Sequence, residues 1–127
     1  MSVTVIDASA VAAVLFDEPE AAPVIAGVSG PLLAPGLLRY ELASVCATKL
    51  RNEPRRAKLT LQRYRLLPGL DIEFAEPDWT ALPVLARQWD VSAYDAAYLL
   101  LALERKAPLV TLDARLASAF DRAAARK

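Results

Sequence analysis

The stretch Val3-Thr4-Val5-Ile6-Asp7-Ala8-Ser9-Ala10 joins a β-rich run to the start of a helical pattern, with an aspartate at the junction. The β-rich run predicts a short buried strand that ends at Asp7. Ser9 belongs to the residue types that cap helices, so we expect a helix over residues 10–16. A strand followed at once by a helix is the repeating unit of α/β proteins.

The same alternation returns along the rest of the chain. Further strands are predicted at residues 32–34, 70–74 and 109–112. Helices are predicted at residues 19–28, 37–49, 54–67, 78–89 and 92–106, and from 113 onward. Pro83 lies inside one of these helices, which predicts a kink or a late start. The alternation predicts one α/β domain over residues 1–127 with a mostly parallel sheet.

The chain contains no histidine, and this excludes several kinds of catalysis. Ser-His-Asp and Cys-His nucleophilic mechanisms, histidine general bases and histidine-bound zinc all need that side chain. Any chemistry must therefore use carboxylates, hydroxyls, lysines or arginines. Carboxylates that bind hard divalent cations are the option that this composition favours.

The single cysteine, Cys46, cannot form an internal disulfide, which agrees with a reducing compartment. Because its neighbours are apolar, we expect a small buried hydrophobe at this position and not a reactive thiol. The N-terminus has no basic segment, and the longest strongly apolar run, residues 96–103, is far short of the roughly 20 residues that span a membrane. We expect a cytoplasmic protein with no membrane contact.

Charge is balanced overall, with 15 basic and 15 acidic residues, but it is distributed unevenly. Seven basic residues crowd one segment: Lys49, Arg51, Arg55, Arg56, Lys58, Arg63 and Arg65. Two interpretations stand, namely solvated helix faces or a patch that steers phosphate groups toward an acidic site. The hydrophobic content of 55% is high for a monomer of this size and predicts a protein partner or a homodimer.

Four acidic residues stand out by position: Asp7, Glu41, Asp95 and Asp113. Asp7 and Asp113 each follow a strand and precede a helix, where helix capping explains them equally well. A solvated position in the first helical turn is the simpler interpretation of Glu41 taken alone. Asp95 differs, because its helix is apolar nearly all round and an unpaired buried carboxylate is costly there.

The predicted topology brings these four residues (the acidic cluster) together at the carboxyl edge of a parallel sheet, where ligand crevices form. Like charges about 4 Å apart repel by on the order of 4 kcal/mol at an effective dielectric near 20, and a divalent cation relieves that repulsion. Oxygen ligands favour Mg²⁺ or Mn²⁺, and such sites hydrolyse phosphodiester bonds. Ser9 and Thr111 are predicted to support a carboxylate by hydrogen bonding, although capping and strand propensity explain them equally well.

These residues lie in motifs that resemble those of the PIN-domain ribonucleases, most closely the VapC toxins of prokaryotic toxin–antitoxin pairs. The resemblance extends from Val3 to about Phe120. The four motifs are, in order, Val5-Ile6-Asp7-Ala8-Ser9-Ala10 with Leu15-Phe16-Asp17-Glu18-Pro19, then Pro35-Gly36-Leu37-Leu38-Arg39-Tyr40-Glu41-Leu42-Ala43, then Ser92-Ala93-Tyr94-Asp95-Ala96-Ala97-Tyr98, and last Leu109-Val110-Thr111-Leu112-Asp113.

The resemblance implies a PIN-like fold, with three α/β/α layers around a short, mostly parallel sheet of about four strands. It implies a Mg²⁺ or Mn²⁺ site at Asp7, Glu41, Asp95 and Asp113, and endonucleolytic cleavage of RNA. It also implies a homodimer and a VapB-type antitoxin that covers the acidic site. Relatives often carry a further short strand after the last helix, so we expect a shorter sheet edge here.

Other classes of protein match parts of the pattern. A catalytically inactive PIN-like module that binds RNA or protein is one, although it gains nothing from clustered carboxylates. A phosphatase of the haloacid-dehalogenase type needs a second acid two residues after the first, where Ser9 stands. A receiver domain needs adjacent acids at the first strand. The sequence leaves open which RNA is cut and whether one or two ions bind.

Overall fold

Four parallel strands form the central sheet of the computed structural model, which describes residues 2–126. Their spatial order is β3-β2-β1-β4. The strands are β1 (Thr4–Ile6), β2 (Leu32–Ala34), β3 (Glu73–Phe74) and β4 (Leu109–Val110). This confirms the predicted short parallel sheet of about four strands.

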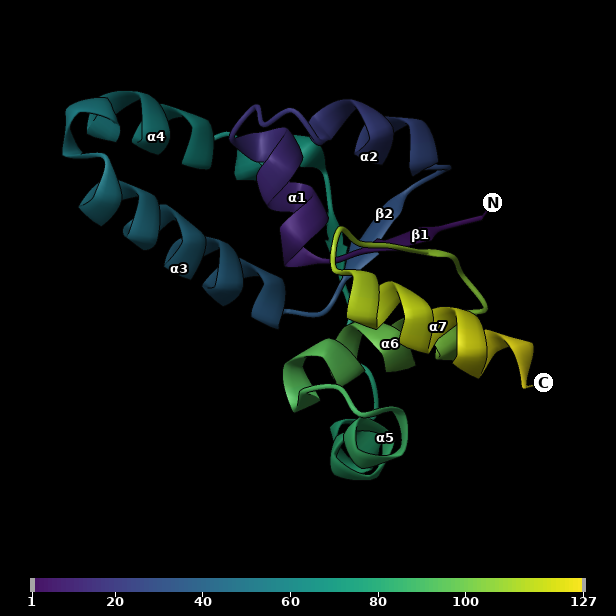
Figure 1. Ribbon diagram of the computed structural model, residues 1–127. Coiled ribbons are helices and arrows are strands. Elements are labelled where there is room, and N and C mark those ends of the chain that lie inside the picture. The colour runs from purple at the N-terminus through teal and green to yellow at the C-terminus, as the bar shows by residue number, and fades with distance from the viewer. Residues whose placement is uncertain (1, 127) are drawn as a thin grey trace.

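Seven α-helices surround the sheet within the described residues. They are α1 (Ala8–Leu15), α2 (Ala21–Gly27), α3 (Leu37–Asn52), α4 (Ala57–Tyr64), α5 (Leu82–Trp89), α6 (Ala93–Arg105) and α7 (Ala114–Ala125). Short 3₁₀ turns are η1 (Pro54–Arg56), η2 (Leu67–Leu70) and η3 (Trp79–Ala81). Figure 1 shows α1 and α2 on one side of the strands and α5, α6 and α7 on the other, so the chain has the expected α/β/α layers.

Several predicted boundaries shift in the structure for local physical reasons. Asp7, and not Ser9, caps α1, because its carboxylate accepts a hydrogen bond from the Ala10 amide. The strand predicted at 70–74 is shortened because Asp71 has a positive φ of 55°, which interrupts extended backbone. Pro83 lies in the first turn of α5, so the late start is confirmed and the helix is not kinked by it.

The order of the strands creates a switch point beside β1. The chain builds the sheet from β1 through β2 to β3 and then places β4 on the opposite side of β1. Val5 pairs with Leu33 on one side and with Leu109 on the other. In open α/β sheets, ligands bind outside the carboxyl ends of the strands at such a point. Asp7, which directly follows β1, lies there.

The core holds the helices that carry the acidic cluster in fixed positions. Leu38 and Leu42 on α3 and Leu99 on α6 are fully buried. Cys46 is also buried, and burial raises the pKa of its thiol, so it is the small hydrophobe that the sequence predicts. Each helix is therefore anchored close to the acid it presents at the sheet edge.

Candidate active site

Asp7 is the buried centre of the site, with 5% of its surface exposed. Its Oδ1 accepts hydrogen bonds from the Ser9 hydroxyl at 2.7 Å and the Ala10 amide at 3.1 Å, and its Oδ2 accepts one from the Thr111 hydroxyl at 2.5 Å. Burial raises its pKa, and the charge of Asp113 adds to the increase, although the three hydrogen bonds lower it. Asp7 is thus both a helix cap and a desolvated carboxylate.

Two hydroxyls tie the end of β1 to the segment that follows β4. Ser9 Oγ accepts a hydrogen bond from the Leu112 amide at 3.0 Å, and Thr111 Oγ1 accepts one from the Asp113 amide at 3.0 Å. Both hydroxyls donate to Asp7, as the sequence predicts for a supporting role. The contacts fix the Asp7 carboxylate against the backbone that leads to Asp113.

Asp113 is the exposed member of the acidic cluster and caps α7. Its Oδ1 accepts hydrogen bonds from the amides of Arg115 at 2.9 Å and Leu116 at 3.1 Å. The capping role considered for this residue is therefore real. The second carboxylate oxygen, Oδ2, has no hydrogen-bond partner within residues 2–126, and it is available to a ligand.

Glu41 is held by a partner that the sequence did not reveal. The Tyr98 hydroxyl, on α6, donates a hydrogen bond of 2.6 Å to Glu41 Oε1, on α3. Tyr98 is 1% exposed and Glu41 is half-buried, so this bond between two helices is partly shielded from solvent. Burial raises the pKa of Glu41, and the charges of Asp95 and Asp7 add to the increase, while the bond from Tyr98 lowers it. Glu41 is the fifth residue of α3, so it lies just past the first turn.

Asp95 lies in the first turn of α6, where the Ser92 hydroxyl caps the helix by accepting a hydrogen bond from the Asp95 amide at 3.0 Å. The side chain is partly exposed, because this turn extends past the buried part of the helix. Desolvation raises its pKa, and the charges of Asp113 and Asp7 raise it further. The Ser92 bond and the charge of Arg115 oppose the increase.

The structure brings the predicted acids near enough for several of their charges to interact: Asp113 raises the pKa of Asp7 and of Asp95. The charge of Asp7 raises the pKa of Glu41 and of Asp95, and the charge of Asp95 also raises the pKa of Glu41. Within residues 2–126 none of the four forms an ion pair with a lysine or arginine. Arg115 pairs instead with Asp90 at 2.6 Å. The described residues thus leave the cluster without an ion-pair partner, and Arg115 only partly offsets the charge around Asp95.

The chemistry of the donor set suits a hard divalent cation, because every candidate ligand is a carboxylate oxygen. In the described part of the chain, no three acidic side chains stand close enough to hold one ion as they are placed. Binding of a shared ion would therefore require the carboxylates to move toward one another. Glu41 Oε2 and Asp113 Oδ2 are among the carboxylate oxygens that accept no hydrogen bond in the described residues.

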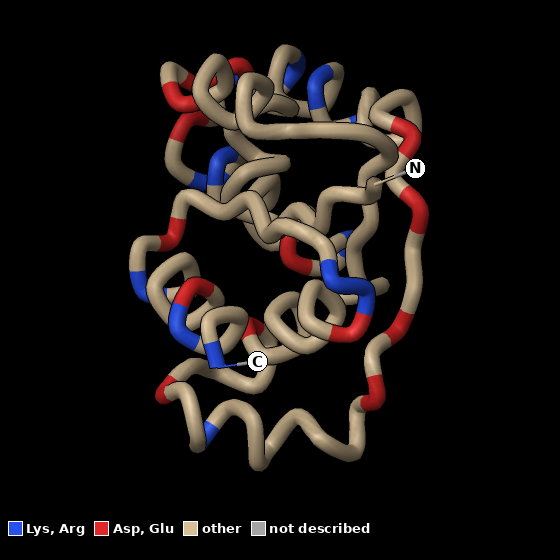
Figure 2. The backbone as a smooth tube through the Cα atoms, turned by 90° about the vertical axis from the view of Figure 1, so that its right-hand side faces the viewer, with Lys and Arg blue, Asp and Glu red and all other residues tan. Residues whose placement is uncertain are grey.

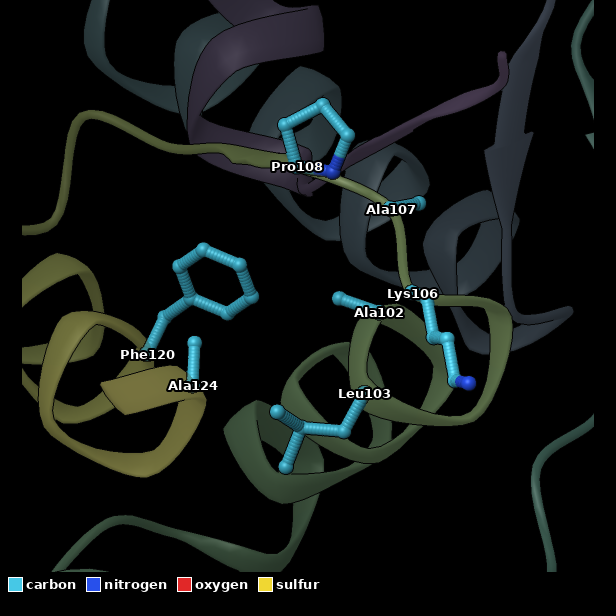
Figure 3. A pocket seen from close by; sticks show the side chains of 7 residues that line it. All are labelled: Ala102, Leu103, Lys106, Ala107, Pro108, Phe120 and Ala124. Carbon is cyan, nitrogen blue, oxygen red and sulfur yellow. The ribbon is translucent and has the colours of Figure 1, made fainter. Parts of the chain in front are cut away.

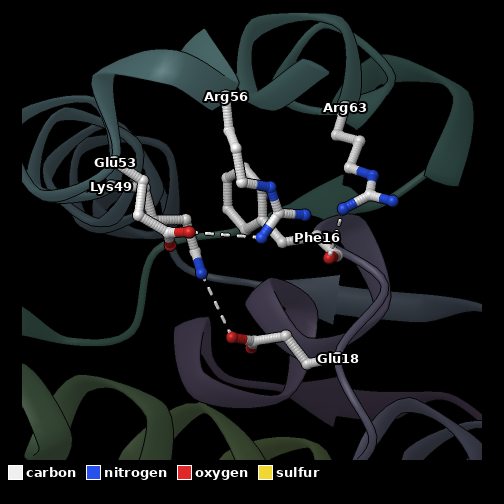
Figure 4. A network of polar contacts seen from close by, with 6 residues as sticks. All are labelled: Phe16, Glu18, Lys49, Glu53, Arg56 and Arg63. Carbon is white, nitrogen blue, oxygen red and sulfur yellow. Dashed lines mark hydrogen bonds and ion pairs between the residues drawn. The ribbon is translucent and has the colours of Figure 1, made fainter.

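The basic segment is partly used for structure. Lys49 Nζ contacts Glu18 at 3.2 Å, and Arg63 donates to the Phe16 carbonyl at 3.1 Å, so both hold the end of α1 (Figure 4). Arg56 pairs locally with Glu53 at 3.3 Å. Figure 2 shows basic and acidic positions interspersed over much of the backbone, with acidic positions alone along the right-hand edge. Phosphate steering by the other basic residues stays a prediction.

An apolar pocket of about 430 Å³ lies between the end of α6 and α7 (Figure 3). It is lined by Ala102, Leu103, Lys106, Ala107, Pro108, Phe120 and Ala124. The pocket begins seven residues along α6 from Asp95, about 10 Å at 1.5 Å per residue. It contains a single charged side chain, Lys106, and no carboxylate. This pocket is therefore separate from the acidic cluster.

Comparison with known proteins agrees with the geometry. The PIN domain model matches residues 4–124, so the chain belongs to the PIN-domain family. A solved structure, PAE2754 from Pyrobaculum aerophilum, superposes with a TM-score of 0.75, covering 98% of this chain and 94% of that one at 18% sequence identity. That likeness shows the fold. No protein with a curated description matches the sequence.

PIN domains are generally nucleases that use divalent metals. No helix within residues 2–126 is both long and apolar enough to cross a membrane.

Proposed function

We propose that this protein is a Mg²⁺- or Mn²⁺-dependent endoribonuclease. The observation that carries the proposal is the desolvated Asp7 carboxylate, which shares its surroundings with three further acids and no paired cation. A protein stores such repulsion at a functional site and relieves it with a ligand. Membership in a family of nucleases makes RNA phosphodiester hydrolysis the reaction that uses this arrangement.

The position of each acid in the fold suggests its role in binding the cation. When bound, a divalent cation activates water and stabilises negative charge on a phosphoryl oxygen. Asp7, fixed by Ser9 and Thr111, is the rigid ligand. Asp95 and Asp113 bring negative charge from the α6 and α7 N-termini, and Glu41 is oriented by Tyr98. Each acid thus reaches the site from a different element, with its backbone held by the core.

Purified protein should cut RNA in the presence of Mg²⁺ or Mn²⁺ and not in EDTA. Asp7→Asn and Asp95→Asn keep the size of each side chain but remove its charge, so both should lose at least 100-fold in rate if they hold the ion. Asp121→Asn, on the exposed outer part of α7, is the matched control and should cut at the wild-type rate. Wild-type rates in both site variants would refute the proposal.

A catalytically inactive PIN-like module that binds RNA or protein is the other reading of the same fold. Calorimetric titration with Mn²⁺ separates the two. Binding of the ion that disappears in Asp7→Asn supports the nuclease, whereas no binding at millimolar Mn²⁺ supports the inactive module.

We propose further that the nuclease is a cytoplasmic toxin of the VapC type. This rests on the four motifs, which resemble that subfamily throughout the chain. The role includes assembly as a homodimer and inhibition by a VapB-type antitoxin. A short upstream reading frame that encodes a DNA-binding protein would support it, and so would rescue of growth when the two are expressed together. Sedimentation of the purified protein as a monomer would contradict the dimer.

A further inference from the structure

Three exposed apolar side chains adjoin members of the acidic cluster in sequence. Eight large apolar side chains are strongly exposed in residues 2–126. Three of these directly precede a member of the acidic cluster in sequence: Tyr40, Tyr94 and Leu112. The two tyrosines are 78% and 66% exposed. Single exposed apolar residues are ordinary, but aromatic rings beside two of four active-site acids are a specific coincidence.

Helix geometry directs Tyr94 toward the Glu41 side of the site. On a helix, residues four apart lie on the same face, so Tyr94 stands one turn before Tyr98 on α6. Tyr98 contacts Glu41 of α3 through its 2.6 Å hydrogen bond. Tyr94 therefore lies on the face of α6 that meets the start of α3, one turn closer to solvent.

Tyr40 approaches the same region from the other helix. It precedes Glu41 and points away from Leu38 and Leu42, which are fully buried and define the core side of α3. Two residues correspond to about 200° around a helix of 3.6 residues per turn, so Tyr40 is directed to solvent while Glu41 lies between it and the core. The two exposed rings consequently border the acidic cluster on its Glu41 side, one from each helix.

We propose that Tyr40 and Tyr94 form a base-contacting subsite that receives unpaired bases of the RNA next to the cleaved bond. This inference rests on the proposed nuclease function and adds the residues that hold its substrate. Tyrosine rings stack on the faces of unstacked bases, and stacking of this kind tolerates many sequences. Bases inside a duplex are already stacked, so the subsite would be used by single-stranded segments.

The test measures RNA binding separately from cleavage. The probe is a short, fluorescein-labelled, single-stranded RNA of mixed sequence with phosphorothioate linkages, which resist hydrolysis. Its affinity for the full chain is measured by fluorescence anisotropy in Mg²⁺. Tyr40→Ala and Tyr94→Ala should each weaken binding by about 5-fold or more, in line with the measured contribution of base–aromatic stacking. Tyr40→Phe and Tyr94→Phe keep the ring and should restore most of the affinity.

Trp79→Ala is the matched control. Trp79 is 75% exposed, but the adjacent Asp78 amide contacts Glu104 Oε2 at 3.4 Å, near the other end of α6. Glu104 is nine residues from Asp95, or about 13 Å along the helix. This variant should bind the RNA like the wild type, and a perfect duplex of the same sequence should be insensitive to all the tyrosine substitutions.

The outcomes distinguish this inference from the nuclease proposal. Unchanged affinity in the alanine variants, equal weakening by Trp79→Ala, or no binding of single-stranded RNA by the wild type would overturn the subsite. A protein that binds through both tyrosines but never cuts unmodified RNA in Mg²⁺ or Mn²⁺ would keep the subsite and overturn the nuclease. If the protein cuts RNA in Mg²⁺ or Mn²⁺ and neither tyrosine affects binding or cleavage, the nuclease proposal stands and the subsite is overturned.

Discussion

At the scale of single residues, the hydrogen bond from Tyr98 to Glu41 can be removed by deleting a single hydroxyl group. Tyr98→Phe deletes one hydroxyl and retains the buried ring, so the fold should persist. Glu41 would lose its fixed orientation, and contacts that orient a metal ligand are typically worth 10- to 100-fold in affinity or rate. We expect weaker Mn²⁺ binding by calorimetry and a matching loss of RNA cleavage, with an unchanged circular dichroism spectrum. Unaltered Mn²⁺ affinity would show that Tyr98 serves packing alone.

The raised pKa of Asp95 makes a prediction about stability and pH. Because the folded state holds the proton more tightly than the unfolded chain, this residue's contribution is complete below the unfolded pKa, about 3.8, and is lost as pH rises through the folded pKa. Asp95→Asn stays neutral throughout. In EDTA at neutral pH the variant should therefore melt a few degrees above the wild type. Below pH 3.8 the difference should vanish.

Thermal unfolding followed at both pH values, with Asp121→Asn as a control, measures this difference. A variant that is less stable than the wild type at neutral pH would mean that Asp95 is stabilised by its surroundings.

Sequence position pointed to the four acids and to the hydroxyls of Ser9 and Thr111, but not to Tyr98 as the partner of Glu41. Asp7 and Asp113 are recognisable because each directly follows a strand, and Asp95 because it interrupts an apolar helix. Tyr98 is 57 residues from Glu41, and no local pattern distinguishes a buried tyrosine with that role from an ordinary core residue. The only signal was its place within the third motif, one turn after Asp95.

At the scale of elements, α1 is held at both ends by side chains from elsewhere in the chain. Its first turn is capped by Asp7, while its last residues are bound by Arg63, whose guanidinium reaches the Phe16 carbonyl. Arg63→Met keeps most of the apolar stem and removes this bond. We expect a loss of about 1–2 kcal/mol in the free energy of unfolding, because a charged donor to a half-buried acceptor is lost.

Arg56→Met is the matched control, since Arg56 belongs to the same segment but forms an exposed pair with Glu53. Exposed pairs of this kind contribute about 0.5 kcal/mol or less. Urea denaturation of the two variants compares them directly. Equal losses would show that the contact with Phe16 does not stabilise α1.

Element boundaries were predictable where one residue type decides them. Ser92 and Asp113 cap their helices as expected, because their side chains accept bonds from the amides that begin α6 and α7. Between Asp7 and Ser9 the sequence could not choose, since both residue types cap helices. The choice depends on Thr111, which is distant in sequence and draws the Ser9 hydroxyl into the network around Asp7.

At the scale of the whole molecule, the sheet order explains why residues far apart in sequence share one site. With β4 beside β1, the segments that follow these two strands emerge together, and α3 and α6 begin at the same edge. Alternation of strands and helices predicted the parallel sheet, but not which strands are neighbours, because pairing depends on long-range contacts. That order places the elements that carry the four acids at one edge of the sheet.

We propose that the four acids share a bound cation. Anomalous scattering of Mn²⁺ in crystals grown with that ion tests this directly. We expect a peak bonded to carboxylate oxygens of Asp7 and Asp95, with Glu41 and Asp113 turned toward it, and no such peak in Asp7→Asn. Mn²⁺ that binds only elsewhere on the protein, with the four carboxylates left apart, would contradict it.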